Sequence, residues 1–420
     1  MKAMQSLTPA PVEKSALLRA CKESGLLRIF FTVTAGAGIG AFAWGRSESI
    51  DSLAILLALP GLWRLLKSRS EAFTLMLAYY LAGARDLSND VSVFFGNAAP
   101  QGTGMVMWIG ASILLSLPFA LFWSVKPTQR AFGFLLAVLV CIPPPLGIIG
   151  WLNPLTVAGV IFPGAGWVGL AMTLILFVAL ASCNRALLMP LVTAAVISNG
   201  FATSSAARTP ENWQGFDTSF EGLASGGMDR ASQYLSAMQR TEWLNNVIAD
   251  MPSGVTLVLP ETILGRYDGV VKMLLGEADA ILRAKGSRVL VGAELPLATG
   301  QYKNSVLVLG ATQDDGQVAS QGIPVPAGMW KPWAEDGAKA DFLARENTII
   351  VDGRRIGASI CYEQLLAYSL LRLMVDKPEI ITAVSNVWWA KSGSIPKIQS
   401  QSVHAFATLF SVPVVAARNF

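Results

Sequence analysis

The chain has few charged residues, four cysteines and a single histidine. Charged residues make up 14% of its 420 residues, whereas hydrophobic residues make up 53%. This composition is too apolar for an ordinary soluble globular protein. The histidine, His404, and the cysteines show no spacing that is typical of a metal site, and only Cys361 lies in the second half of the chain. We therefore expect no metal, no cofactor and no disulfide within that half.

Charge is scarcest in the first half of the chain. No aspartate or glutamate occurs between Asp90 and Glu211. The lysines and arginines of the first half lie beside apolar segments, which is typical of membrane topology signals. We predict a membrane region over residues 1–203 and a soluble domain over residues 204–420. No stripe of basic and aromatic residues marks the second domain, so we expect no nucleic-acid partner.

Seven apolar segments predict about seven transmembrane helices. A full span requires about 20 apolar residues, so the second and third segments are short enough to form a re-entrant pair. Pro143, Pro144 and Pro145 predict a kink or break in the fifth. The segments cover residues 25–45, 51–66, 70–84, 105–124, 131–152, 157–182 and 186–201.

The positions of lysine and arginine predict the orientation of this region. With a cytoplasmic N-terminus, 11 of these residues lie on the cytoplasmic side and only Arg46 and Arg85 lie outside. Because basic residues favour the cytoplasmic side, we expect a bacterial inner-membrane protein with a cytoplasmic N-terminus and a periplasmic C-terminal domain. Membrane lipid is then an expected partner. No small-residue cleavage site follows a short apolar core, so the first span is expected to stay as an anchor.

The second half of the sequence predicts an α/β domain. Short apolar runs alternate with amphipathic segments, as expected for strands that alternate with helices. The predicted helices cover residues 229–249, 269–285, 364–374 and 399–409, and the predicted strands cover residues 255–259, 288–295, 304–310, 347–351, 355–360, 380–384 and 412–417.

Two reactive side chains directly follow predicted strands. Glu261 follows the run that ends at Leu259, and Cys361 follows the run that ends at Ile360. A thiol attacks a carbonyl only as the thiolate, so it requires a nearby base or positive charge. Glu261 and His404 are the two candidate partners, and either suits acyl transfer through a thioester. A lone cysteine in an apolar strand is also compatible with a small buried hydrophobe.

Six short motifs follow one another along the second half. They are Leu259-Pro260-Glu261-Thr262, Tyr302-Lys303-Asn304-Ser305, Pro324-Val325-Pro326, Met329-Trp330-Lys331-Pro332-Trp333, Cys361-Tyr362-Glu363 and Ser385-Asn386-Val387-Trp388-Trp389. Four of them have the order and spacing of the nitrilase (carbon–nitrogen hydrolase) superfamily, which the chain resembles. The membrane region followed by this domain looks like an apolipoprotein N-acyltransferase. The two tryptophan- and proline-rich motifs around residues 324–333 resemble the conjugal-transfer TraB proteins, a plasmid-borne branch of that group.

The resemblance implies an αββα sandwich with a Glu-Lys-Cys triad. By match with the motifs, Glu261 is the general base and Cys361 is the nucleophile. Glu363 is then a supporting carboxylate, and Tyr362 and Trp388 line the site.

The sequence departs from this family at the lysine. The position that carries lysine in the acyltransferases falls on Gln321, and a nearby glutamate position falls on Met329. Glutamine donates a hydrogen bond but carries no charge, and the loss of a charged partner for an oxyanion costs about 3 kcal/mol, or about a hundredfold in rate. Lys303 and Lys331 are candidates to substitute for the missing lysine.

Three functions are compatible with these residues. The first is a periplasm-facing thiol amidase or N-acyltransferase that acts on a lipid-linked or peptide-like substrate, such as a lipoprotein, and is associated with conjugal plasmid transfer. The second is an inactive envelope component of the conjugation system, which binds other envelope proteins; Gln321 and Met329 favour it. The third is a hydrolase with a Cys361–His404 pair.

Overall fold

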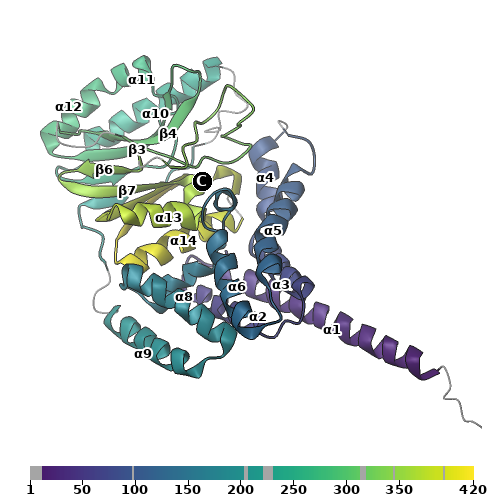
Figure 1. The fold of residues 1–420 in the computed structure, drawn as a ribbon. Coiled ribbons are helices and arrows are strands. Elements are labelled where there is room, and N and C mark those ends of the chain that lie inside the picture. Colours follow the sequence, from purple (N-terminus) through teal and green to yellow (C-terminus); the bar gives the residue numbers. More distant parts are fainter. Residues whose placement is uncertain are drawn as a thin grey trace, which may run out of the picture.

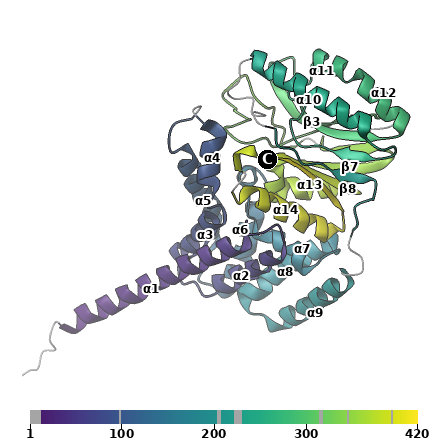
Figure 2. The same ribbon diagram turned by 180° about the vertical axis from the view of Figure 1, so that it is seen from behind.

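A computed structural model describes residues 12–96, 99–202, 207–220, 230–312, 318–343, 346–390 and 393–420. The first half of the chain forms a helical part, and the second half forms an α/β part that rests on it (Figure 1). Helix α1 extends well beyond the rest of the molecule, which both views show (Figures 1 and 2).

The helical part contains two helices that are long and apolar enough to cross a membrane. They are Gly25–Ala43, within α1, and Thr103–Phe122, which is α5; a pair bent by 120°, Pro154–Ile161 and Gly166–Ser182, adds a third if it counts as one span. The elements of this part are α1 (Val12–Ala43), η1 (Asp51–Leu57), α2 (Ala58–Trp63), α3 (Arg69–Gly83), α4 (Leu87–Phe95), α5 (Thr103–Phe122), α6 (Pro127–Val140), η3 (Leu146–Ile148), η4 (Pro154–Val157), α7 (Ala158–Ile161), α8 (Gly166–Ser182) and α9 (Arg185–Ala202).

Helices occupy all seven segments for which we predicted spans, but several are short. The apolar helices Asp51–Trp63, Pro127–Val140 and Arg185–Phe201 each have fewer than 18 residues. Helix α6 ends at Val140, just before the three prolines, as their rigid backbone requires. The structure thus supports association with a membrane, while seven crossings and their orientation stay predictions.

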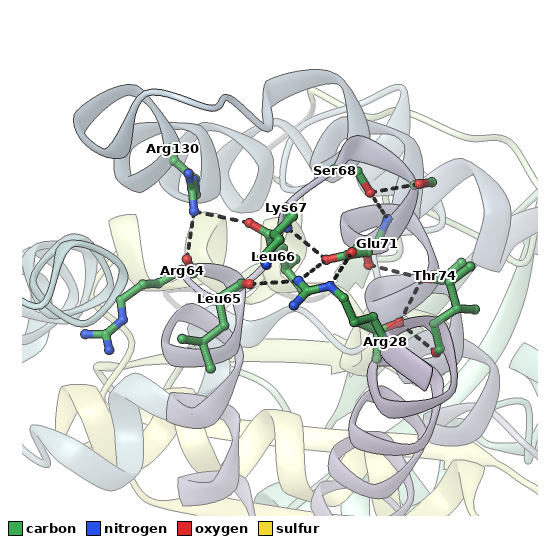
Figure 3. A network of polar contacts seen from close by, with 12 residues as sticks. Arg28, Arg64, Leu65, Leu66, Lys67, Ser68, Glu71, Thr74 and Arg130 are labelled. Carbon is green, nitrogen blue, oxygen red and sulfur yellow. Dashed lines mark hydrogen bonds and ion pairs between the residues drawn. The ribbon is translucent and has the colours of Figure 1, made fainter. Parts of the chain in front are cut away.

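A network of polar contacts joins α1, α3 and the segment before α3 (Figure 3). The Arg28 guanidinium donates to both carboxylate oxygens of Glu71, at 2.9 and 2.8 Å. Glu71 also accepts from the backbone N–H of Lys67, and the Ser68 side chain caps the start of α3. Arg130 donates to backbone carbonyls of the segment between α2 and α3. These contacts satisfy backbone groups that the ends of short helices would otherwise leave without partners.

The α/β part contains two mixed sheets. The first has the order β1-β2-β3-β4-β5, in which β1, β2 and β3 are parallel and β4 and β5 are antiparallel to their neighbours. The second has the order β6-β7-β8-β9, in which only β6 is antiparallel to its neighbour. The strands are β1 (Trp213–Gly215), β2 (Thr256–Val258), β3 (Arg288–Pro296), β4 (Tyr302–Leu309), β5 (Val318–Ser320), β6 (Thr348–Val351), β7 (Arg354–Ile360), β8 (Ile380–Asn386) and β9 (Val414–Asn419).

The two sheets pack against each other through a buried hydrophobic core. Val258 and Leu290 of the first sheet lie in one buried cluster with Ile360 and Val384 of the second. Helices cover the outer faces of both sheets (Figures 1 and 2). Those on the first sheet are α10 (Arg230–Asp250), α11 (Gly269–Leu274) and α12 (Gly276–Lys285), and those on the second are α13 (Ala367–Val375) and α14 (Ile395–Phe410). The prediction of an α/β domain is therefore confirmed.

Helix α14 joins the α/β part to the helical part. Gln401, which is fully buried, accepts a hydrogen bond from the backbone N–H of Gly45 and donates to Ala43 O, Ser49 O and Ser52 Oγ. The Gln401 side chain thus supplies hydrogen-bond partners for the backbone that follows α1. The two parts of the molecule are therefore packed against each other.

Candidate functional site

Cys361 lies where β7 gives way to a short 3₁₀ turn, η5 (Cys361–Leu365). Its φ is 47°, a left-handed conformation that non-glycine residues seldom adopt. Its side chain is buried, with 4% of the residue exposed. A strained residue at a strand end occurs often at functional sites, because it turns a side chain out of the sheet.

Glu261 follows β2 in the other sheet, and the fold brings it to Cys361. The Cys361 thiol lies close enough to the Glu261 carboxylate for each group to shift the pKa of the other. Asn304 Nδ2 donates to Glu261 Oε1 at 2.5 Å, and the backbone N–H of Asn386 donates to Glu261 Oε2 at 2.9 Å. Glu261 and Cys361, which follow strands of different sheets, therefore lie next to each other in the folded chain.

Burial favours the neutral, protonated form of both the Glu261 carboxyl and the Cys361 thiol. It raises the pKa of Glu261, although the hydrogen bonds from Cys361, Asn304 and Asn386 act in the opposite direction. Burial, followed by the negative charge of Glu261, raises the pKa of the Cys361 thiol well above its ordinary value. Both effects favour the protonated thiol over the thiolate.

Gln321 lies beside this pair but contributes no charge. Its Nε2 donates to Ile360 O at 2.9 Å, and its Oε1 accepts from Asn304 Nδ2 at 3.0 Å. Lys303 forms an ion pair with Glu346 instead of reaching the thiol, because it points away from the face on which Asn304 lies. Lys331 is absent from the described residues that line the cavity at Cys361.

Glu363 lies on the far side of the same turn. Its Oε1 accepts from the backbone N–H groups of Gly322 and Ile323, at 3.0 and 3.2 Å, whereas its Oε2 has no hydrogen-bond partner. Burial raises the pKa of this carboxyl to about 7, against the effect of those two hydrogen bonds. Glu363 therefore supports the segment that follows Gln321.

Tyr362 leaves the turn in the direction of the helical part. Its hydroxyl donates to Ile148 O at 2.8 Å, and its ring packs edge-to-face on Trp151 at 6.4 Å. Tyr362 thus connects the turn that follows Cys361 to the helical part.

An apolar cavity of about 320 Å³ begins at Cys361 and lies between the two parts of the molecule. Tyr362 lines it. The tryptophan that lines it is Trp389, which packs edge-to-face on Phe94 at 5.6 Å, and not Trp388. Trp388 and Trp389 are neighbours in one short 3₁₀ turn, so the motif alone could not show which of them lines the cavity. The helical part supplies Ala84, Leu87, Val91, Phe94, Phe95, Val106, Met107, Gly110, Ala111, Leu114, Ile149, Trp151 and Leu152.

His404 lies elsewhere. Its ring Nδ1 contacts Ser400, and the residue lines a different cavity, beside the turn between α7 and α8. Cys361 instead lies beside Glu261 and lines the apolar cavity between the two parts of the molecule. The hypothesis of a Cys361–His404 pair is therefore wrong.

From the sequence, we assigned no role to three polar residues of this site. Asn304 links Glu261 to Gln321, Asn386 donates to Glu261, and Gln399 of α14 donates from Nε2 to Cys361 O at 2.9 Å. Asn304 and Asn386 both belong to motifs that resemble the superfamily, and this was the signal in the sequence that could have identified them. Within the described chain, no group of three or more His, Cys, Asp or Glu residues is arranged to hold a metal ion.

Comparison with known proteins identifies the family. A probable conjugal transfer protein TraB of Sinorhizobium fredii is 33% identical over 399 residues, which cover 91% of this chain and 95% of that protein. The conjugal transfer protein TraB of Agrobacterium fabrum is 31% identical and covers 93% of each chain. The chain belongs to the TraB family of conjugal transfer proteins. No general protein-family model matches it.

Solved structures of the nitrilase superfamily are similar to about half of this chain. An amidase of the nitrilase superfamily from Nesterenkonia covers 50% of this chain and 78% of its own, with 9% identity and a TM-score of 0.34. A carbon–nitrogen hydrolase from Helicobacter pylori covers 49% of this chain and 72% of its own, with 16% identity and a TM-score of 0.33.

Proposed function

We propose that this TraB protein is a membrane-anchored thiol enzyme that forms or cleaves an amide bond to an apolar acyl group during conjugal transfer. Cys361 is the nucleophile, Glu261 is the general base and Glu363 supports the segment that follows Gln321. The domain that carries them is a nitrilase-type αββα sandwich. The observation that carries the proposal is a nucleophile–base pair at the end of an apolar cavity.

The reaction begins with proton transfer from the Cys361 thiol to Glu261. The thiolate attacks the acyl carbonyl and forms a tetrahedral intermediate, which the backbone N–H groups near the sulfur are able to stabilise. The bond to the leaving group breaks, and the leaving group takes the proton from Glu261. Water or an amine then attacks the thioester, gives one proton to Glu261, and releases the thiolate, which is protonated again.

The lining of the cavity supports a lipid-like acyl donor. Its wall is almost entirely apolar and includes α5, one of the two helices able to span a membrane. Burial of each methylene of an acyl chain contributes about 0.8 kcal/mol. We therefore propose membrane lipid as the source of the acyl group and a lipoprotein or peptide-like amine as the acceptor, with the cavity on the periplasmic side of the inner membrane.

The experiment that tests this function detects an acyl-enzyme. The full-length protein in detergent micelles is incubated with p-nitrophenyl decanoate and analysed by mass spectrometry. We expect one decanoyl group on Cys361, sensitive to hydroxylamine, none in Cys361→Ala, and formation slowed at least about a hundredfold in Glu261→Gln. Decanoylation of Cys361 at the same rate in Glu261→Gln, or none in the wild type, would refute the proposal.

A cavity-filling variant tests where the acyl chain binds. Gly110 of α5 lines the cavity, and a side chain added there meets no atom within 4 Å. Gly110→Phe is expected to slow decanoylation of Cys361 about tenfold or more, while acetylation by p-nitrophenyl acetate stays unchanged. Gly38→Phe is the matched control, because Gly38 also has open space and does not line the cavity. An equal loss of both acylations would contradict this placement.

One observation favours an inactive envelope component as the second candidate. Gln321 brings no positive charge to Cys361, and it is hydrogen-bonded to Ile360 O and Asn304 as a purely structural residue would be. A descendant of this kind would bind other envelope proteins of the conjugation system through the retained fold. It predicts that Cys361 is not acylated at all, so the same mass measurement distinguishes the two candidates.

A further inference from the structure

Two buried amide oxygens beside Cys361 and Glu261 lack a hydrogen-bond partner. They are Asn304 Oδ1 and Gln399 Oε1, and each residue is at most 2% exposed. Both atoms are acceptors. A buried polar group without a partner is destabilising by about 1–3 kcal/mol, so this arrangement favours a ligand that donates hydrogen bonds.

The other contacts of the two amides fix which of their atoms is unsatisfied. Gln399 Nε2 donates to Cys361 O, and Asn304 Nδ2 donates to both Glu261 Oε1 and Gln321 Oε1. Rotation of either amide by 180° would place its oxygen against another oxygen. The free atoms are therefore the oxygens, and what is missing from the site is a donor.

The charges of this region indicate that the donor is a cation. Glu261 is buried, and the part of the chain that the structure describes contributes no lysine or arginine to the wall of the cavity at Cys361. The amide of Gln321 is already occupied by Ile360 O and Asn304. A buried carboxylate is strongly unfavourable without a counter-charge, and its negative charge also opposes formation of the thiolate.

We propose that the primary ammonium group of the acceptor substrate supplies the positive charge that the protein itself does not provide at Cys361. This inference rests on the proposed function, because that reaction defines the acceptor. The ammonium binds at the thiol end of the cavity, where Gln399 lines the wall, and its N–H groups donate to the unsatisfied oxygens. The acceptor thus activates the nucleophile before it is itself acylated.

The proton balance gives the order of events. With the ammonium bound, the Cys361 proton passes to Glu261, the thiolate attacks the acyl carbonyl, and the leaving group departs with that proton. The ammonium then gives one proton to Glu261 and becomes a free amine. The amine attacks the thioester carbon, its second proton passes to solvent as the tetrahedral intermediate collapses to the amide, and the released thiolate recovers a proton from Glu261.

Alkylation of Cys361 by iodoacetamide tests the inference without an acyl donor. Full-length protein in detergent micelles is alkylated at neutral pH and constant ionic strength, and mass spectrometry of its peptides follows Cys361 separately from Cys21, Cys141 and Cys183. Methylammonium chloride is the probe. Tetramethylammonium chloride is the control, since it has the same charge but no N–H donor.

A cation within about 4–6 Å lowers the pKa of an acidic group by about 1–3 units. We therefore expect methylammonium to speed alkylation of Cys361 about tenfold or more and tetramethylammonium to leave it unchanged. Equal rates in the two salts would overturn the inference.

Two variants test where the charge comes from. Gln321→Lys is expected to alkylate quickly without methylammonium and to show no further response to it. Lys391 lies outside the described residues, and Lys391→Met is expected to respond to methylammonium as the wild type does. Loss of that response in Lys391→Met would overturn the inference, because the chain's own lysine would then be required.

The outcomes separate this inference from the function on which it rests. The activated decanoyl ester acylates even a small thiolate fraction, so decanoylation of Cys361 with equal alkylation rates in both salts would refute the ammonium site alone. A methylammonium response without any decanoylation would refute the acyl-transfer function and leave the ammonium site in place.

Discussion

Three buried glutamines donate hydrogen bonds to three consecutive backbone carbonyls that end at Cys361. Gln364 donates to Ser359 O at 3.0 Å, Gln321 to Ile360 O at 2.9 Å, and Gln399 to Cys361 O at 2.9 Å. The sheet ladder ends at this point, so side chains supply the donors that buried carbonyls require. Gln321 thus stabilises the backbone at a position where a lysine was expected from the resemblance.

The sequence predicted part of this site at the residue scale. Cys361 and Glu261 could be singled out because each stands directly after an apolar strand. The role of Gln399 could not be predicted, because its side chain reaches Cys361 only through the packing of α14 on the turn. Polar contacts between distant elements leave no periodic signal in a sequence.

Glu363 is expected to make stability depend on pH. Its pKa is about 7 in the folded chain, against 4.5 for an ordinary glutamate. Between these values the unfolded chain releases a proton that the folded chain retains, so stability falls as the pH rises from about 4.5 to about 7. The difference corresponds to about 3 kcal/mol. Glu363→Gln is expected to lose this part of the decline and to be the more stable protein above pH 7.

The measurement is the thermal unfolding midpoint of both proteins in detergent at pH 5 and at pH 8. The wild-type midpoint is expected to fall by several degrees more than that of Glu363→Gln over this interval. Glu335→Gln serves as the control, because Glu335 is exposed. Parallel profiles for the wild type and Glu363→Gln would contradict the prediction.

At the scale of elements, two glycines let α1 approach the backbone of α3. A Cβ at Gly36 would lie 2.1 Å from Leu75 O, and a Cβ at Gly40 would lie 2.2 Å from Tyr79 O. Small residues four apart allow such close packing of apolar helices. Gly40→Leu is therefore expected to separate the helices and to destabilise the helical part by about 3 kcal/mol.

Unfolding in detergent checks this prediction. Gly38 lies between the two glycines in sequence, but a side chain added there meets nothing within 4 Å. Gly38→Leu is the matched control and should unfold at the wild-type temperature. If Gly40→Leu unfolded at that same temperature, the close approach of α1 and α3 would have no energetic importance.

Long periodic elements were easier to predict than short ones. The apolar runs predicted most strands and helices of the α/β part, whereas β1 and β5, of three residues each, were not predicted. Pairing with a neighbouring strand stabilises such short segments, and their own residues indicate little. The single helix predicted over residues 269–285 is two helices, α11 and α12, which meet at Leu275.

At the scale of the whole molecule, the distribution of basic residues predicts which side of the membrane the α/β part occupies. Alkaline phosphatase is active only outside the cytoplasm, so its fusion after Ala202 is expected to be active and its fusion after Lys126 inactive. Green fluorescent protein fused at the same two points should give the opposite pattern. Activity after Lys126 but not after Ala202 would reverse the topology.

The sequence separated the two parts but did not predict that they share a cavity. Helix α4 was not predicted at all, although Leu87, Val91 and Phe94 form much of the wall opposite Cys361. Its nine residues are too few to indicate a span, and only the folded arrangement brings them to the thiol.

This shared cavity has a consequence for the search for inhibitors. A fragment that contains only the α/β part would keep Cys361 and Glu261 but would lose the wall that α4 and α5 provide. Compounds selected against such a fragment would be chosen for reactivity with sulfur alone. Selective compounds must be sought with the full-length chain in a lipid environment, where affinity for the apolar wall distinguishes this thiol from the many other cysteines of a bacterial cell.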